Sequence, residues 1–219
     1  MIIARLLCLP VLLLLSGCVS LSAGPLPAVV HSTQVSSEAT GPAVAFDLQL
    51  GVAEPQLLSL WQSNRVLLRT VDDELGVLQG VVLADETAQV VQTSLIEALQ
   101  AQAGLRGVGR PGDGSRNEWL LLSDLPRFEL DYRSAPGTAV IELNLRVLET
   151  SSGRVLASTR LSAEHNLPDI GTVGSAERSR AHARELIALL QQQTLRAAEW
   201  LHGLAERCGA AAPQDGFEG

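Results

Sequence analysis

The residues of this 219-residue chain that could perform acid–base or nucleophilic chemistry are few and scattered. His165 could be combined with Ser175 and one of Asp131 and Asp169 into a hydrolytic triad, in which the histidine would take the proton of the serine hydroxyl. Nothing around Ser175 resembles a nucleophile elbow or another local catalytic signature. We therefore expect no catalytic residue, and a hydrolase is kept as the weaker alternative.

A metal site is a second chemical possibility, because His182 and Glu185 are three residues apart on one predicted helix. A histidine nitrogen and a carboxylate on the same helix face can both ligate a cation. Arg178, Arg180 and Arg184 surround the pair, and their charges would repel a metal ion. We interpret the pair as a solvated helix face, and we expect neither a metal nor a cofactor.

One cysteine stands in a context that predicts covalent modification. The motif Leu15-Ser16-Gly17-Cys18 ends a ten-residue apolar run that is too short to cross about 30 Å of hydrocarbon. A basic residue followed by such a run and by small residues is typical of a secretory signal, here residues 1–17. The motif resembles the bacterial lipobox. The resemblance implies cleavage before Cys18, a thioether from its sulfur to diacylglycerol, and acylation of the new amino group by fatty acids such as palmitate.

Lipid attachment at Cys18 would hold the chain on a membrane. Each buried methylene adds about 0.8 kcal/mol, so three acyl chains make the anchoring effectively permanent. Residue 19 is Val rather than Asp, which in the usual bacterial sorting rule favours the periplasmic face of the outer membrane over the inner membrane. Cys208 then has no intramolecular disulfide partner, and we expect a free thiol or an intermolecular link.

Composition excludes further classes of function. All 16 basic residues are Arg, against 24 acidic residues, which gives a formal net charge of −8. Without Lys, the chain cannot form a Schiff base or place a Walker-type lysine on a phosphate. An acidic chain with 3% aromatic residues also lacks the basic patches and stacking rings that nucleic-acid binding requires, so no nucleic acid is expected as a partner.

Hydropathy patterns predict one α/β domain over residues 43–207, between a flexible tether (18–42) and a polar tail (208–219). The tether would reach about 25–30 Å. Strands are expected where apolar residues alternate, at 44–50, 65–70, 76–82, 125–132, 141–147 and 155–163, the last three as an antiparallel meander. Helices are expected from an N-cap at Asp85 to a C-cap at Gly104, and over 176–207. The Gly-rich segment 107–116 is expected to be an exposed loop.

Packing roles are predicted for the remaining prominent residues. The last helix carries a stripe at 4-3-4-3 spacing, which favours packing on the sheet over a coiled-coil seam. The three tryptophans are expected in the core or at its rim, with a partner-facing surface as the alternative. The acidic runs Asp72-Asp73-Glu74 and Asp85-Glu86 are interpreted as solvated turn and helix-start carboxylates. The stripe consists of Ala183, Ile187, Leu190, Thr194, Ala197, Leu201 and Leu204, and the tryptophans are Trp61, Trp119 and Trp200.

The order of these features resembles the ABC-type transport auxiliary lipoproteins, the PqiC-like proteins, over residues 44–202. Two departures stand out: residues 57–61 replace a Leu-Asp-Arg-like segment, and Leu83-Ala84-Asp85 lacks the aromatic residue of a Trp-Ala-Asp-like motif. The matching segments are Asn64-Arg65-Val66-Leu67-Leu68-Arg69-Thr70, Leu95-Ile96-Glu97-Ala98-Leu99, Val108-Gly109-Arg110-Pro111-Gly112, Phe128-Glu129-Leu130-Asp131-Tyr132 and Ser152-Gly153-Arg154-Val155-Leu156-Ala157.

The resemblance implies a fold and a set of partners. The implied fold is a mixed, largely antiparallel sheet flanked by two main helices, similar to the amino-terminal domain of TolB. The implied function is that of a non-enzymatic auxiliary subunit of a transporter for lipids or other hydrophobic compounds. Its partners would be a mammalian-cell-entry-domain protein, an ABC permease complex and, in a ring, further copies of itself. A lipid-binding carrier is the alternative within the same compartment.

Overall fold

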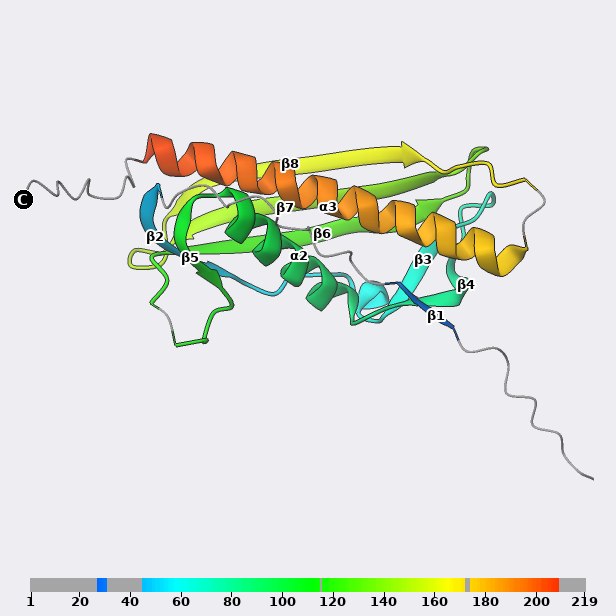
Figure 1. Cartoon of the computed structure of the whole chain (residues 1–219), viewed down its shortest axis with the longest axis horizontal. Coiled ribbons are helices and arrows are strands. Elements are labelled where there is room, and N and C mark those ends of the chain that lie inside the picture. The colour runs from blue at the N-terminus through cyan, green and yellow to red at the C-terminus, as the bar shows by residue number, and fades with distance from the viewer. Residues whose placement is uncertain (1–26, 31–44, 115, 172–173, 209–219) are drawn as a thin grey trace, which may run out of the picture.

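The computed structural model describes residues 27–30, 45–114, 116–171 and 174–208. In this part of the chain, one eight-stranded mixed sheet is combined with two long helices and a short 3-10 helix (Figure 1). This confirms the expected fold class. The elements are β1 (Ala28–Val30), β2 (Phe46–Val52), η1 (Ser59–Trp61), β3 (Arg65–Arg69), β4 (Leu75–Leu83), α2 (Thr87–Gln102), β5 (Leu105–Gly109), β6 (Trp119–Asp131), β7 (Thr138–Glu149), β8 (Val155–Asn166) and α3 (Ser175–Arg207).

The 13-residue strand β6 organises the sheet. Along one edge it pairs in parallel with β2 through its first residues and with β3 through its last ones. Along the other edge it pairs antiparallel with β7, which pairs antiparallel with β8. The predicted meander is therefore confirmed. Beyond β2 lies β5, and beyond β3 lie β4 and then β1. The two ends of β6 thus mark the two ends of an elongated molecule (Figure 1).

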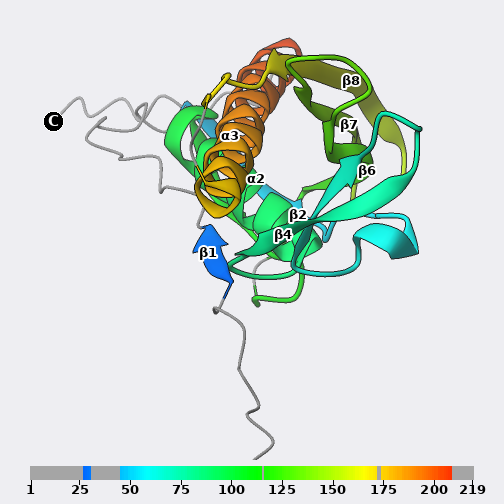
Figure 2. The same ribbon diagram turned by 90° about the vertical axis from the view of Figure 1, so that its right-hand side faces the viewer.

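Both helices pack on the same side of the sheet, which curves around them (Figure 2). Helix α3 contacts strands from β1 at one edge to β8 at the other. Every residue of its predicted apolar stripe is buried, which confirms the packing interpretation. On β6, Phe128 and Leu130 face this core and are at most 1% exposed. Because side chains alternate along a strand, Arg127 and Glu129 point to the opposite face.

The expected unstructured tether is wrong for residues 28–30. These residues form β1, which pairs in parallel with β4, and Val30 is only 8% exposed. Three residues are too few to show an alternating pattern, and the pairing partner lies about fifty residues further along the chain. The composition of residues 28–30 therefore does not predict this strand.

Two smaller predictions also need correction. Residues 107–109 belong to β5, since they complete the edge of β2, and are not part of an exposed loop. The N-cap of α2 is Glu86 rather than Asp85, and no side chain caps the helix. Instead, the main-chain N–H of Thr87 donates to the carbonyl oxygen of Ser63 at 3.0 Å, and its hydroxyl donates to the same oxygen. Gly104 follows α2 at φ 66°, as expected for a C-terminal cap.

Candidate functional site

The most concentrated group of charged residues lies where β3, β6 and the β3–β4 turn meet. Its centre is Glu129, whose side chain is fully buried on the sheet face opposite the helices. One carboxylate oxygen of Glu129 accepts hydrogen bonds from Arg127 Nη2 at 2.7 Å and from Arg69 Nε at 3.2 Å. A buried carboxylate requires such partners, because burial strongly disfavours an unpaired charge.

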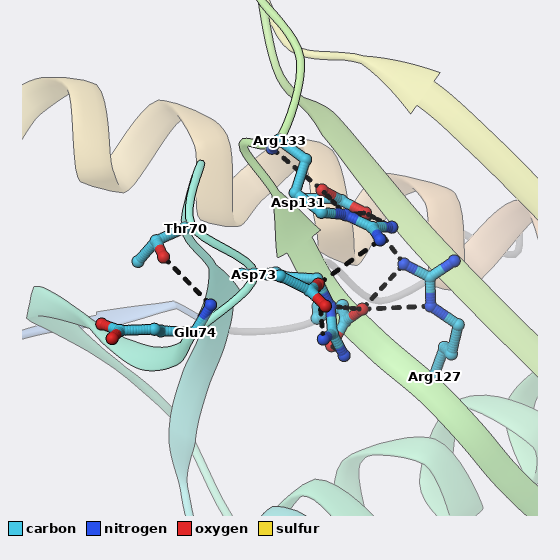
Figure 3. Close-up of polar contacts among 8 residues, drawn as sticks. Thr70, Asp73, Glu74, Arg127, Asp131 and Arg133 are labelled. Carbon is cyan, nitrogen blue, oxygen red and sulfur yellow. Dashed lines mark hydrogen bonds and ion pairs between the residues drawn. The ribbon is translucent and has the colours of Figure 1, made fainter.

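Asp131, two residues further along β6, extends this group. It accepts hydrogen bonds from Arg133 Nη2 at 2.6 Å and from Arg127 Nη2 at 3.0 Å (Figure 3). The hydrogen bond from the Arg133 side chain is the main cause that lowers the pKa of Asp131 to about 2. Asp131 therefore stays ionised throughout the neutral range and cannot act as a general acid there.

Asp73, in the β3–β4 turn, closes the group. The turn is held by Thr70, whose hydroxyl accepts from the main-chain N–H of Glu74 at 3.1 Å (Figure 3). Asp73 lies 3.1 Å from Arg69 and 3.4 Å from Arg133. We call Arg69, Asp73, Arg127, Glu129, Asp131 and Arg133 the arginine–carboxylate cluster.

The arginine–carboxylate cluster is a structural clamp. Its three guanidinium groups and three carboxylates compensate one another, and they tie the β3–β4 turn to β6 and to the start of the β6–β7 turn. Sequence reasoning missed it, and it treated Asp73 only as a solvated turn residue. The available signal was the recurrence of charge at every second residue from 127 to 133 in an otherwise apolar strand.

The pKa of Asp131 predicts an acid-dependent loss of stability. The folded-state pKa of Asp131, about 2, lies below the ordinary 3.8. The ionised carboxylate therefore contributes to the free energy of unfolding above pH 4, and this contribution is lost as the pH falls through 2. The stability difference between the parent and Asp131→Asn should shrink by roughly 2 kcal/mol between pH 5 and pH 2. Urea unfolding of both chains at the two pH values measures this. A difference that stays constant would contradict the assigned pairing.

His182 is buried, not on a solvated helix face as predicted. It is 4% exposed, and its Nε2 lies 3.2 Å from the carbonyl oxygen of Pro168, which can only accept a hydrogen bond. Nε2 therefore carries the proton, and Nδ1 accepts from the hydroxyl of Tyr132 at 2.7 Å. Burial raises the pKa of Tyr132 to about 12. Glu185 does not share a site with His182, because it lies 3.5 Å from Nε2 of His165.

The bond between Tyr132 and His182 joins α3 to the end of the sheet. In Tyr132→Phe the buried Nδ1 of His182 loses its donor, and the free energy of unfolding should fall by about 1–3 kcal/mol. Thermal unfolding measures this, with the exposed substitution His165→Asn as the control, expected within about 0.5 kcal/mol of the parent. Equal stability of Tyr132→Phe and the parent would show that the bond is not formed.

The structure does not assemble the hypothetical triad. Asp131 is held by arginines, and Asp169 accepts from the main-chain N–H of Gly171 at 3.0 Å. His165 lies beside Glu185, while Ser175 begins α3. Within the described ranges, no group of three or more His, Cys, Asp or Glu residues could hold a metal ion.

A surface groove of about 760 Å³ lies at the opposite end of the molecule from the cluster. It is formed where β6 begins and β7 ends, and Trp119, Glu118, Asn117 and Glu149 contribute to its wall. Trp119 is only 6% exposed and Trp61 only 5%, while Trp200 packs partly buried against the core. The tryptophans are thus used for packing, as predicted.

Of the two cysteines in the predicted mature chain, the structure describes only Cys208. Cys208 is exposed and free, at the end of α3. Cys18 and the rest of the lipobox lie outside the described residues, so lipidation remains a prediction from the sequence. Among the helices of the described segments, none has the length and apolar character needed to cross a bilayer.

The fold and the paired charges define a class: a mixed α/β body with two helices on one side of its sheet and a charge cluster that serves its structure. The chain belongs to the family of ABC-type transport auxiliary lipoprotein components, whose model matches residues 29–192. This confirms the resemblance found in the sequence. The match begins within β1, in agreement with the place of that strand in the sheet.

Solved structures share the fold. A DUF330 protein from Xanthomonas campestris is 25% identical, with a TM-score of 0.67, and the similarity covers 83% of this chain and 99% of that one. An uncharacterized protein with 13% identity has a TM-score of 0.60, with 81% and 99% coverage, and shows the fold alone. No curated protein sequence matches the chain.

Proposed function

We propose that this protein is a periplasmic lipoprotein, anchored through Cys18 to the outer membrane, that serves as a non-enzymatic auxiliary subunit of an ABC-type transporter. The observation that carries this proposal is the family match, which spans most of the folded body. The lipobox, read from the sequence alone, supports the anchor. Residues 1–17 would be removed as the signal peptide, and Cys18 would become the first residue of the mature chain.

The absence of catalysis is supported by how the candidate groups are used. The carboxylates of the arginine–carboxylate cluster are paired with guanidinium groups, and both nitrogens of His182 are occupied. A general acid or base must be able to reach a substrate and exchange a proton with it. These groups instead hold strands and helices together, which suits a subunit that acts by binding.

The proposal also covers the other subunits of the transporter and the compounds that it moves. We propose that the transporter contains mammalian-cell-entry-domain subunits and an ABC permease complex, and that it moves lipids or other hydrophobic compounds across the envelope. The protein would connect this assembly to the outer membrane, with several copies arranged in a ring. These assignments rest on the family resemblance.

The test is affinity purification of the full chain, tagged at its C-terminus, from detergent extracts of the bacterial envelope. A mammalian-cell-entry-domain protein should be recovered with the parent, and an untagged strain is the control. Recovery of unrelated proteins only, in several detergents, would contradict the proposed partner. Mass spectrometry of the same sample distinguishes the carrier alternative, which requires lipid bound in proportion to the protein.

A further inference from the structure

Strand β1 fixes the chain to the folded body only ten residues after Cys18. Ala28 pairs with Val81 and Val30 with Leu83, and the main-chain N–H of Ala84 donates to the carbonyl oxygen of Val30 at 3.1 Å. Helix α3 also contacts β1. The segment that joins the lipid to the body is therefore much shorter than residues 18–42.

The place of β1 also decides from which end the anchor departs. Because β1 is parallel to β4 at Val81–Leu83, the chain that precedes Ala28 leaves on the side from which β4 arrives, which along the β3–β4 ladder is the side of Leu75. Without β1, the first fixed element would be β2, which starts at Phe46 and pairs with the opposite end of β6 (Figure 1). With β1 in place, the anchor segment is therefore attached at the β4 end of the molecule. Without β1 it would be attached at the β2 end.

The length of the anchor segment restricts the position of the bilayer. The register shift in β4 shortens its path along the sheet, because Val82 pairs with Arg65 and Leu75 with Arg69, only four residues or about 13 Å apart. Ten residues reach at most about 33–36 Å. With the β3–β4 turn towards the membrane, the bilayer therefore lies no more than about 20–25 Å beyond the start of β4. The groove beside Trp119 lies about 25–30 Å from Ala28 in the other direction, so the segment would have to be nearly fully extended for this end to touch lipid.

We propose that β1 sets the orientation of the protein on its membrane, so that the β3–β4 turn contacts the lipid surface and the Trp119 groove points away from it. This inference rests on the proposed anchoring at Cys18. The turn carries two exposed apolar side chains, Val71 at 73% and Leu75 at 42%. Asp72 and Glu74 keep the turn acidic, so the surface that it fits is zwitterionic rather than anionic.

The test attaches the lipid chemically, which makes it independent of lipidation in the cell. Residues 18–219 with Cys208→Ser are coupled through Cys18 to maleimide lipids in phosphatidylcholine vesicles. A photoreactive benzoylphenylalanine is placed at Val71 in one sample and at the exposed Ser151, beside the groove, in another. We expect several-fold more lipid cross-linking from position 71. Equal cross-linking, or more from position 151, would overturn the proposed orientation while leaving anchoring at Cys18 intact.

Two matched pairs test the part played by β1. Val30→Asp should release the strand and remove the preference for position 71, whereas Val29→Asp, at a side chain 52% exposed, should keep it. Ten Gly and Ser residues inserted before Ala28 should weaken the preference, and the same insertion after Val30 should not. Circular dichroism confirms that each variant is folded. An equal effect of the two insertions would show that β1 does not hold the anchor segment.

Discussion

Replacing Cys18 with Ser, behind a signal peptide that is cleaved without lipidation, should move the protein from the membrane fraction to the soluble fraction of the envelope. Without the thiol, no thioether to diacylglycerol can form. Since three acyl chains make attachment effectively permanent, we expect the loss of membrane association to be almost complete. Fractionation after an alkaline wash measures it.

Cys208→Ser is the matched control for this substitution. Cys208 is exposed and free at the end of α3, so its replacement should leave both the fold and the membrane association unchanged. A Cys18→Ser chain that has lost its signal peptide and still sediments with membranes would contradict the anchoring assigned to Cys18.

Glu129→Gln should lower the free energy of unfolding by about 2–4 kcal/mol. The substitution keeps the shape of the side chain but removes the charge that compensates Arg69 and Arg127 in the arginine–carboxylate cluster. Breaking a fully buried ion pair costs about 3–5 kcal/mol. The expected loss is somewhat smaller here, because the two arginine side chains are 22% and 28% exposed and keep some hydration.

Asp124→Asn provides the control on the same strand. Asp124 pairs with Arg146 at 3.4 Å, but both side chains are substantially exposed, and such surface pairs contribute about 0–1 kcal/mol. Urea denaturation of the two variants should therefore separate them clearly. Similar losses from both substitutions would show that Glu129 is not the centre of the cluster.

Those parts of the fold that depend on local periodicity could be predicted from the sequence. The stripe on α3 repeats over many turns, and β6, β7 and β8 alternate long enough for their pairing as a meander to be expected. The structure mainly lengthens these elements. Short strands such as β1 and β5 escape such reasoning, because what makes them strands is a partner elsewhere in the chain.

The polar contacts were harder to predict for the same reason. Arg69 and Glu129 are 60 residues apart, and Tyr132 and His182 are 50 apart, so no local spacing brings them together. The neighbours of His182 along the helix indicate a solvated face, whereas its environment is set by the sheet end against which the helix packs. Cys18 is the opposite case, since the motif that predicts its lipidation is contiguous in the sequence.

The chemical state of the mature amino terminus decides whether the protein is anchored through Cys18 as proposed. Intact-mass analysis of the full-length chain, expressed in its own envelope and extracted from membranes, tests this directly. We predict the mass of residues 18–219 increased by a diacylglyceryl group and one further acyl chain. A membrane-extracted protein with the unmodified mass of that chain, or one still carrying residues 1–17, would contradict the lipid anchor and, with it, the proposed orientation on the membrane in the cell.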